Sequence, residues 1–195
     1  MTQKLSIKQK IVWPDDTHYF LTNSTYLHYP YFHTEAQKQI ILNFIKKLKL
    51  EHNIPIQAFS ISINHFHLMF YARLGARVSL VKNFLKGNIT REYRKQYNVP
   101  YENIWGSTKV LWIKDEKMLY GVQGYINGNL LKHKEESNFQ GLCENPFSSF
   151  KYYVNKYGFE YAKEMVLNSI NVDESADGEM DIKKIKKEIT ACKQA

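Results

Sequence analysis

Cysteines and long apolar runs are scarce in this sequence, and their scarcity excludes two classes of protein. The 195 residues include two cysteines, Cys143 and Cys192, which lie too far apart for a metal-binding spacing. Without a disulfide framework, a disulfide-rich secreted protein is excluded and a cytoplasmic location is expected. No apolar run approaches the ~18 residues that a membrane-spanning helix needs, so no membrane association is expected. Residues 1–10 alternate polar and basic side chains, unlike a signal peptide.

Acidic residues are also in deficit. Asp and Glu number 19 against 27 Lys and Arg, which gives a net charge of +8. This balance favours a polyanionic partner, of which nucleic acid is the commonest, although a Lys-rich surface without a specific partner would look the same. The hydrophobic share of 44% is enough for a buried core, and the length suits one compact domain with an appendage.

The first half of the chain predicts a strand, a helix and a hairpin. Thr17 to Tyr26 is rich in aromatic and β-branched residues, which favours a strand. Thr34 and Gln37 form a capping-box pattern at the start of a helix. Ile56 to Tyr71 is too long for one typical strand, so we expect a hairpin that turns near Ile63-Asn64.

The elements that follow complete a recognisable order. We expect a second helix over Val78 to Tyr97, a fourth strand over Lys109 to Lys114, and a third helix from Asp115 to about Lys134. The first six elements, β-α-β-β-α-β, are the ferredoxin-like split β-α-β arrangement, an α+β fold. Both crossover helices should cover one face of the sheet, which leaves the other face for the third helix.

The sequence predicts a main domain over residues 1–155 and a small helical extension over residues 156–195. In the extension we expect a short helix over Phe159 to Leu167 and an acidic linker over Val172 to Met180. A final helix begins at Asp181 and has an isoleucine stripe. Docking of that stripe on the body is favoured over contact with DNA.

Two histidines in the hairpin are candidate metal ligands. Because strand residues two apart point the same way, His65 and His67 share one face, and Phe66, Leu68 and Phe70 share the other. Two imidazoles on one face can bind one metal ion. However, a chain of 195 residues with seven histidines is expected to contain about 0.25 His-x-His matches by chance. The two histidines could therefore also be ordinary strand residues without a metal ion.

The third helix adds a candidate nucleophile and a third ligand. Tyr125 and Asn129 are four apart and so lie on one helical face. A phenol can attack a phosphodiester, and an Asn oxygen is a suitable ligand for Mg²⁺ or Mn²⁺. The chain has 14 tyrosines, so Tyr125 could also be a core or surface residue. Tyr120 on the same helix is the rival nucleophile.

Several of these segments together resemble one family. Asn64-His65-Phe66-His67-Leu68 resembles the HUH motif of single-tyrosine transposases, and Tyr125-Ile126-Asn127-Gly128-Asn129 resembles the catalytic helix of their REP-associated branch. Ile104-Trp105 resembles a tryptophan segment before the fourth strand. Asn145 to Phe150 resembles an aromatic-Ser-Ser-aromatic segment after the catalytic helix. The likeness extends over Thr17 to Tyr153 in the same order.

The resemblance implies a metal-dependent endonuclease that cuts and rejoins single-stranded DNA. Tyr125 would be the nucleophile and would form a 5′-phosphotyrosine, and His65, His67 and Asn129 would hold Mg²⁺ or Mn²⁺. The substrate would be hairpin-forming DNA, such as REP-like sequences or the ends of an insertion sequence. Relatives form both monomers and homodimers, so either state is expected.

The departures from the family pattern spare these four groups. Leu130 stands where the family usually has Pro, and Ile63 where Pro is common. They leave a second hypothesis open: a domesticated, non-catalytic protein that binds hairpin DNA or RNA. A plasmid replication initiator or relaxase ranks last, because those proteins usually carry more domains.

Basic residues of the second helix are candidates for phosphate contacts, and such contacts would make binding salt-dependent. They lie off the apolar stripe: Lys82, Lys86, Arg91 and Arg94. A solvated helix face is an equally good interpretation of each of them.

Overall fold

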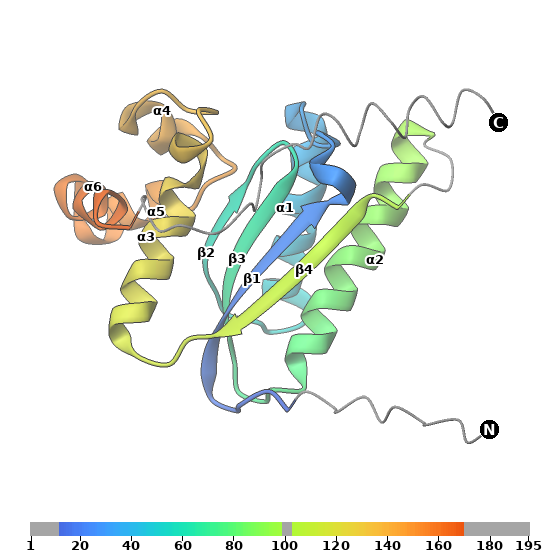
Figure 1. The fold of residues 1–195 in the computed structure, drawn as a ribbon, viewed down its shortest axis with the longest axis horizontal. Coiled ribbons are helices and arrows are strands. Elements are labelled where there is room, and N and C mark those ends of the chain that lie inside the picture. Colours follow the sequence, from blue (N-terminus) through green and yellow to red (C-terminus); the bar gives the residue numbers. More distant parts are fainter. Residues whose placement is uncertain (1–11, 99–102, 170–195) are drawn as a thin grey trace, which may run out of the picture.

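The centre of the protein is a four-stranded antiparallel sheet (Figure 1). The structure, a computed structural model, describes residues 12–98 and 103–169. The strand order is β2-β3-β1-β4. The strands are β1 (Thr17–Thr25), β2 (Ile56–Ile61), β3 (His65–Ala72) and β4 (Trp105–Trp112). The strand that carries both histidines is therefore internal, with hydrogen-bonded neighbours on each side.

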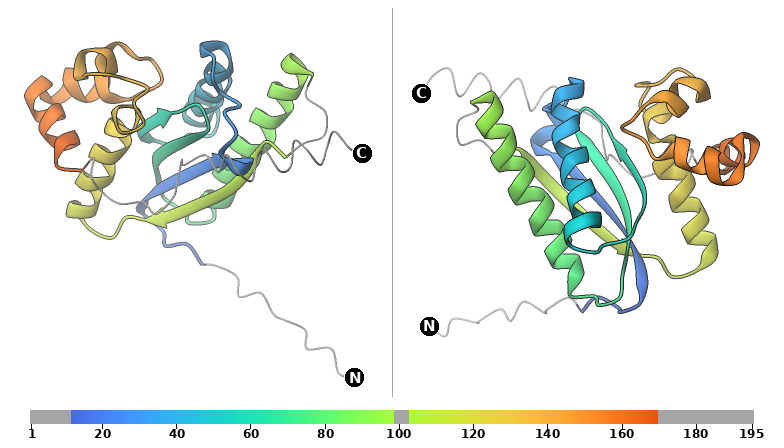
Figure 2. Two further views of the ribbon diagram at one scale, coloured as in Figure 1. Left: turned by 45° about the horizontal axis from the view of Figure 1, so that its top comes forward. Right: turned by 180° about the vertical axis from the view of Figure 1, so that it is seen from behind.

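The two crossover helices lie side by side on one face of the sheet (Figures 1 and 2). They are α1 (Glu35–Glu51) and α2 (Arg77–Tyr97). The predicted capping box is present at the start of α1, where the Gln37 amide donates to Thr34 Oγ1 at 3.3 Å and the Thr34 amide donates to Gln37 Oε1 at 2.9 Å. The predicted α+β, ferredoxin-like arrangement is confirmed.

The third helix, α3 (Glu116–Lys132), lies on the opposite face of the sheet, as predicted (Figure 2). The Asp115 side chain caps it by accepting from the Met118 amide at 2.7 Å. Three shorter helices pack around α3: α4 (Phe139–Glu144), α5 (Phe150–Tyr157) and α6 (Phe159–Leu167). A single turn of 3-10 helix, η1 (Tyr26–His28), follows β1.

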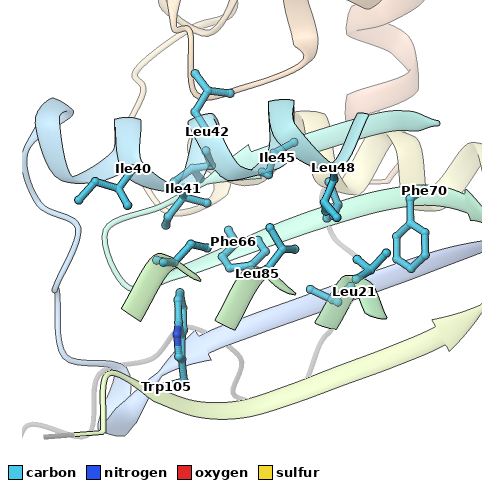
Figure 3. Packing of buried hydrophobic residues seen from close by; sticks show 14 of the residues in the cluster. Leu21, Ile40, Ile41, Leu42, Ile45, Leu48, Phe66, Phe70, Leu85 and Trp105 are labelled. Atoms are coloured by element: carbon cyan, nitrogen blue, oxygen red, sulfur yellow. The ribbon is translucent and has the colours of Figure 1, made fainter. Parts of the chain in front are cut away.

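Each face of the sheet has its own hydrophobic core. Phe66, Leu68 and Phe70 belong to the core under α1 and α2, as the strand alternation predicted. Figure 3 shows Phe66 and Phe70 in this core. The second core joins α3 to α4, α5 and α6 and includes Tyr125 and Met69. The side chains of β3 are therefore divided between two cores.

Some sequence expectations need correction. The fourth strand was predicted at Lys109 to Lys114 but begins at Trp105 and ends at Trp112. It is an edge strand with mostly exposed side chains, so its sequence lacks the alternation that marks a half-buried strand. The helices α4 and α5 were not predicted, because with six and eight residues they are too short to show a clear helical periodicity. The helix α6 was predicted over its observed range.

The acidic linker at Val172 to Met180 and the final helix from Asp181 lie outside the described residues. The structure describes the predicted extension as far as Ser169, and the division at residue 155 stays a prediction. Within the described residues, no helix is both long enough and apolar enough to span a bilayer.

Candidate active site

The two histidines lie side by side on the α3 face of β3. His65 is opposite Ser24 of β1, and His67 is opposite Thr22 of β1 and Ser60 of β2. Their ring centroids are 4.9 Å apart. Both side chains are buried, at 1% and 0% exposure. The sheet thus holds two adjacent imidazoles away from bulk solvent, in the layer between β3 and α3.

Each imidazole is oriented through its Nδ1 atom. His67 Nδ1 is 2.9 Å from Thr22 Oγ1, and His65 Nδ1 is 2.7 Å from Asn64 Oδ1. The Asn64 amide nitrogen donates to the His28 carbonyl at 3.1 Å, so the Asn64 oxygen is the atom that faces His65. His65 Nδ1 must then be the protonated nitrogen, because an amide oxygen only accepts. These contacts leave both Nε2 atoms for another ligand.

Both rings are neutral at pH 7. Burial, with the neighbouring His133 acting in the same direction, lowers the pKa of His65 to about 3, although the nearby Asn129 side chain opposes the shift. Burial also holds the pKa of His67 well below its ordinary value, with the nearby His65 and His133 acting in the same direction. Neutral imidazole is the form that binds a metal ion.

The α3 helix places Tyr125 and Asn129 over the histidines. The Tyr125 ring is 5.2 Å from the His67 ring, and the side chain is 3% exposed. Asn129 Oδ1 is 3.1 Å from His65 Nε2. The rival Tyr120 instead has its ring 6.2 Å from that of Tyr161 on α6. Tyr125 is therefore the tyrosine of α3 that lies beside the histidines.

The polar atoms in this layer fit a cation. Since Nδ1 of neutral His65 carries the proton, its Nε2 has a lone pair, and that lone pair faces the Asn129 oxygen at 3.1 Å. Nε2 of His67 is buried and has no hydrogen-bond partner among the described residues. Buried polar atoms are normally satisfied. A divalent ion bound to these three atoms would satisfy all of them.

An amide ligand is needed for such a site. Across residues 12–98 and 103–169, no three His, Cys, Asp or Glu side chains gather in a way that could hold a metal ion. The His133 ring is 4.7 Å from that of His65 but does not complete such a group. Two imidazoles, the Asn129 oxygen and water would make up the coordination sphere, which suits Mg²⁺ or Mn²⁺.

The basic residues predicted for DNA contact lie on the other side of the sheet. Lys82, Lys86, Arg91 and Arg94 belong to α2, which covers the face opposite the histidines. Burial and the charge of Lys82 lower the pKa of Lys86, so these two ammonium groups are close together. A role for the four residues in DNA binding stays a prediction.

Sequence reasoning missed the cation nearest to the candidate nucleophile. Lys132 Nζ lies 4.9 Å from the centroid of the Tyr125 ring. The two residues are seven apart on α3, which is two helical turns, so helical spacing could have identified the pair. The orienting contacts from Thr22 and Asn64 were also missed. Thr22 could not have been found without the pairing of β1 with β3.

Residues 15–129 match the family described as transposase IS200 like, and this range covers more than half of the chain. The chain belongs to the IS200-like transposase family. The matched range ends at Asn129 and contains all four candidate site residues. This transposase is accordingly an enzyme of DNA transposition, as its sequence motifs suggested.

One solved structure supports the fold of this IS200-like transposase, and two others are similar in part. A REP-associated tyrosine transposase bound to a REP hairpin is similar, with a TM-score of 0.58, 17% identity, and coverage of 88% of this chain and 93% of that one. A Deinococcus radiodurans protein described as a transposase has a TM-score of 0.45 and 18% identity over 63% of this chain and 97% of its own. The tRNA(His) guanylyltransferase of Saccharomyces cerevisiae has a TM-score of 0.49 and 8% identity, with coverage of 89% and 86%. No curated protein matches at a significant level.

Proposed function

We propose that this transposase cleaves and rejoins single-stranded DNA with Tyr125 as its nucleophile and His65, His67 and Asn129 as ligands of Mg²⁺ or Mn²⁺. The observation that carries the proposal is the convergence of two distant segments. The Tyr125 ring lies 5.2 Å from the His67 ring, and Asn129 Oδ1 lies 3.1 Å from His65 Nε2. A nucleophile and a set of metal ligands thus share one buried layer.

The reaction requires one bond to form as another breaks. The Tyr125 oxygen would attack the scissile phosphorus in line and displace the 3′-oxygen, and the phenol proton would leave through water. The products are a 5′-phosphotyrosine and a free 3′-OH. Attack by a 3′-OH on that phosphotyrosine would rejoin strands and return the phenol, so no nucleotide cofactor is consumed. If bound by His65, His67 and Asn129, a divalent ion would supply positive charge beside the scissile phosphate.

Lys132 has a place in this scheme. Its ammonium group lies over the Tyr125 ring, at 4.9 Å from the centroid. A positive charge there favours the negative charge that develops on the phenol oxygen during attack, and it attracts the phosphate backbone. We therefore assign Lys132 to the positioning of the nucleophile and the DNA.

The substrate that we propose is hairpin-forming DNA with a single-stranded segment. The similar REP-associated transposase was solved with a REP hairpin. A net charge of +8 is suited to a DNA partner. Attack on the backbone also requires an accessible strand, which a fully paired duplex does not offer to a buried tyrosine.

The test is covalent capture of labelled DNA. The protein is incubated with a labelled hairpin oligonucleotide and Mn²⁺, and the products are separated on a denaturing gel. We expect a covalent protein–DNA adduct that requires the metal ion and is absent from Tyr125→Phe. Tyr120→Phe is the matched control, because it also removes one tyrosine hydroxyl from α3. This variant should still form the adduct.

Two outcomes would contradict the proposal. An adduct that persists in Tyr125→Phe would assign the nucleophile to another residue. Tight, salt-sensitive hairpin binding with no adduct at any Mn²⁺ concentration would instead support a domesticated protein that binds DNA without cutting it.

A further inference from the structure

A groove of about 410 Å³ lies between α1, the outer edge of β2 and the beginning of α5. Ile45 and Phe59 contribute apolar surface, and Lys46 and Lys49 of α1 are basic residues in its wall. It is separate from the histidine site, which lies between β3 and α3. Its volume falls in the range of about 300–1,000 Å³ that is usual for small-molecule sites.

A β-bulge directs Gln57 into this groove. Ile56 pairs with Phe70 and Ala58 pairs with Met69, so Gln57 is an extra residue with no partner on β3. Bulges often redirect a side chain at a functional site. The Tyr153 hydroxyl donates to the Gln57 carbonyl at 3.1 Å and so links α5 to the bulge. The groove therefore contains a residue placed there by an irregularity of the strand.

The Gln57 side chain leaves a polar atom unsatisfied. Its Oε1 is buried and has no hydrogen-bond partner among the described residues. An unsatisfied buried acceptor costs free energy, so a small rotation of this side chain into the groove that it lines would let Oε1 accept a hydrogen bond from a ligand. The amino groups and ring N–H groups of nucleobases are such donors.

Tyr152 supplies an aromatic surface at the same groove. It is 55% exposed, a large fraction for a tyrosine. Lys156 Nζ lies 5.8 Å from its ring centroid. Tyr152 is therefore an exposed aromatic surface with Lys156 beside it and with Lys46 and Lys49 in the wall of the same groove. Exposed aromatic rings flanked by basic residues are characteristic of surfaces that stack the bases of single-stranded nucleic acid.

We propose that this groove binds one unpaired nucleotide of the single-stranded DNA that flanks the hairpin. The base would stack on Tyr152 and donate to Gln57 Oε1, and Lys46 and Lys49 would contact the phosphate. This inference rests on the proposed function, since it assumes that the substrate is single-stranded DNA.

The groove is connected to the catalytic helix. Ser149, which lines the groove, donates to Asn127 Oδ1 at 2.7 Å, and Asn127 stands between Tyr125 and Asn129 on α3. The Ser149 amide also donates to the Phe59 carbonyl at 2.9 Å. A nucleotide in the groove would therefore contact the same segment that holds α3 against β2, which gives the flank of the DNA a defined position relative to the nucleophile.

The first test is photocrosslinking of the full chain in the presence of a chelator, so that no cleavage occurs. The hairpin oligonucleotide carries a short single-stranded flank in which one thymine at a time is replaced by 5-iodouracil. We expect one position of the flank to crosslink to the peptide that contains Tyr152, identified by mass spectrometry. A crosslink from the flank that maps elsewhere, or no crosslink from any position, would overturn the inference.

The second test compares two DNAs by fluorescence anisotropy. Tyr152→Ala should weaken binding of the flanked hairpin about tenfold, as expected for the loss of one base–aromatic stack, and should leave binding of the blunt hairpin unchanged. Tyr152→Phe should bind like the parent protein. Tyr161→Ala removes a comparably exposed tyrosine, 44% exposed on α6, and should have no effect. Equal weakening on both DNAs would overturn the inference.

The two proposals fail separately. If Tyr125 forms its adduct but the flank neither crosslinks to Tyr152 nor depends on it, only the groove inference is wrong. If the flank crosslinks to Tyr152 but no adduct forms with Mn²⁺, the catalytic proposal is wrong and the groove inference stands.

Discussion

Glu135 and Lys38 form an ion pair with Oε2 and Nζ 2.5 Å apart, although 97 positions separate them in the sequence. The other carboxylate oxygen of Glu135 accepts from the Ser62 hydroxyl and, at 3.1 Å, from the Ile63 amide. One carboxylate thus joins the first turns of α1, the β2–β3 turn and the segment just after α3. Because that turn immediately precedes His65, the carboxylate couples the position of α3 to that of the histidine pair.

Removal of this carboxylate should loosen the site. We expect Glu135→Ala to lower the free energy of unfolding by about 3 kcal/mol, because Lys38 would remain largely buried without its partner. We also expect Mn²⁺ affinity to fall about tenfold, as is usual when a group that supports metal ligands is lost. Urea unfolding and calorimetric titration measure the two effects. Glu144→Ala, an exposed change on α4, is the control, and an equal loss in both variants would contradict the prediction.

Metal binding should depend on the proposed ligands and not on their aromatic neighbour. His65→Ala and His67→Ala should each abolish measurable Mn²⁺ binding in a calorimetric titration, with the far-ultraviolet circular dichroism spectrum unchanged. His133→Asn should retain binding, although its ring lies 4.7 Å from that of His65. Loss of binding in His133→Asn, or its retention in His67→Ala, would show that the coordination set is different.

Two glycines of α3 offer a matched pair for testing how the helix is held. A Cβ on Gly124 would come within 2.2 Å of the Met165 carbonyl oxygen and 2.5 Å of Ser169 Oγ, whereas a Cβ on Gly121 would meet nothing within 4 Å. Gly124→Ala should therefore destabilise the protein by about 1–3 kcal/mol and slow adduct formation, because α3 must shift beside Tyr125. Gly121→Ala should stabilise it by up to about 1 kcal/mol, since alanine favours the helix. Thermal unfolding and adduct time courses measure both, and equal effects would contradict the close contact of α3 with α6.

Alkaline stability should depend on Tyr93. Burial raises the pKa of Tyr93 to about 12, with Tyr97 and Tyr29 adding to the shift. Between pH 10 and 12 the unfolded chain therefore loses this proton more readily than the folded one does, so the stability that Tyr93 contributes is complete below pH 10 and is lost as the pH rises through about 12.

The variant Tyr93→Phe tests this dependence. It should lose about 1 kcal/mol at neutral pH, because the hydroxyl donates to the Tyr31 carbonyl at 2.8 Å and accepts from Gln37 Nε2 at 3.1 Å. Above pH 10 its stability should fall less steeply than that of the parent. Urea unfolding at a series of pH values measures both curves, and parallel curves would contradict the assigned pKa shift.

Much of the site could be predicted because its signals are local. Strand alternation placed His65 and His67 on one face of the sheet, and helical spacing placed Tyr125 and Asn129 on one face of α3. The contacts that hold these groups in place are not local. The Glu135–Lys38 pair joins residues almost a hundred positions apart, and the bulge at Gln57 appears only when β2 is paired with β3. In a single sequence, the types and spacings of the residues do not show which distant residues come into contact.

The basic residues of α2 show a different limit. Sequence periodicity correctly placed Lys82 and Arg91 off the apolar stripe of the helix. The crossover rule and the strand alternation together predicted that α2 would cover the face opposite the histidines, but the four residues were selected by charge and periodicity alone. Residues that are good candidates by charge can therefore lie far from the chemistry.

The division into two cores also predicts the order in which an unselected copy of this protein would lose its properties. The core under α1 and α2 supports the ferredoxin-like body, whereas Tyr125 belongs to the core shared by α3, α4, α5 and α6. Substitutions that accumulate in the second core would displace the proposed nucleophile and leave the first core intact. A lineage released from selection for movement could thus lose strand cleavage early and keep a folded body for a long time, which makes α4 to α6 the region where inactive copies should first diverge.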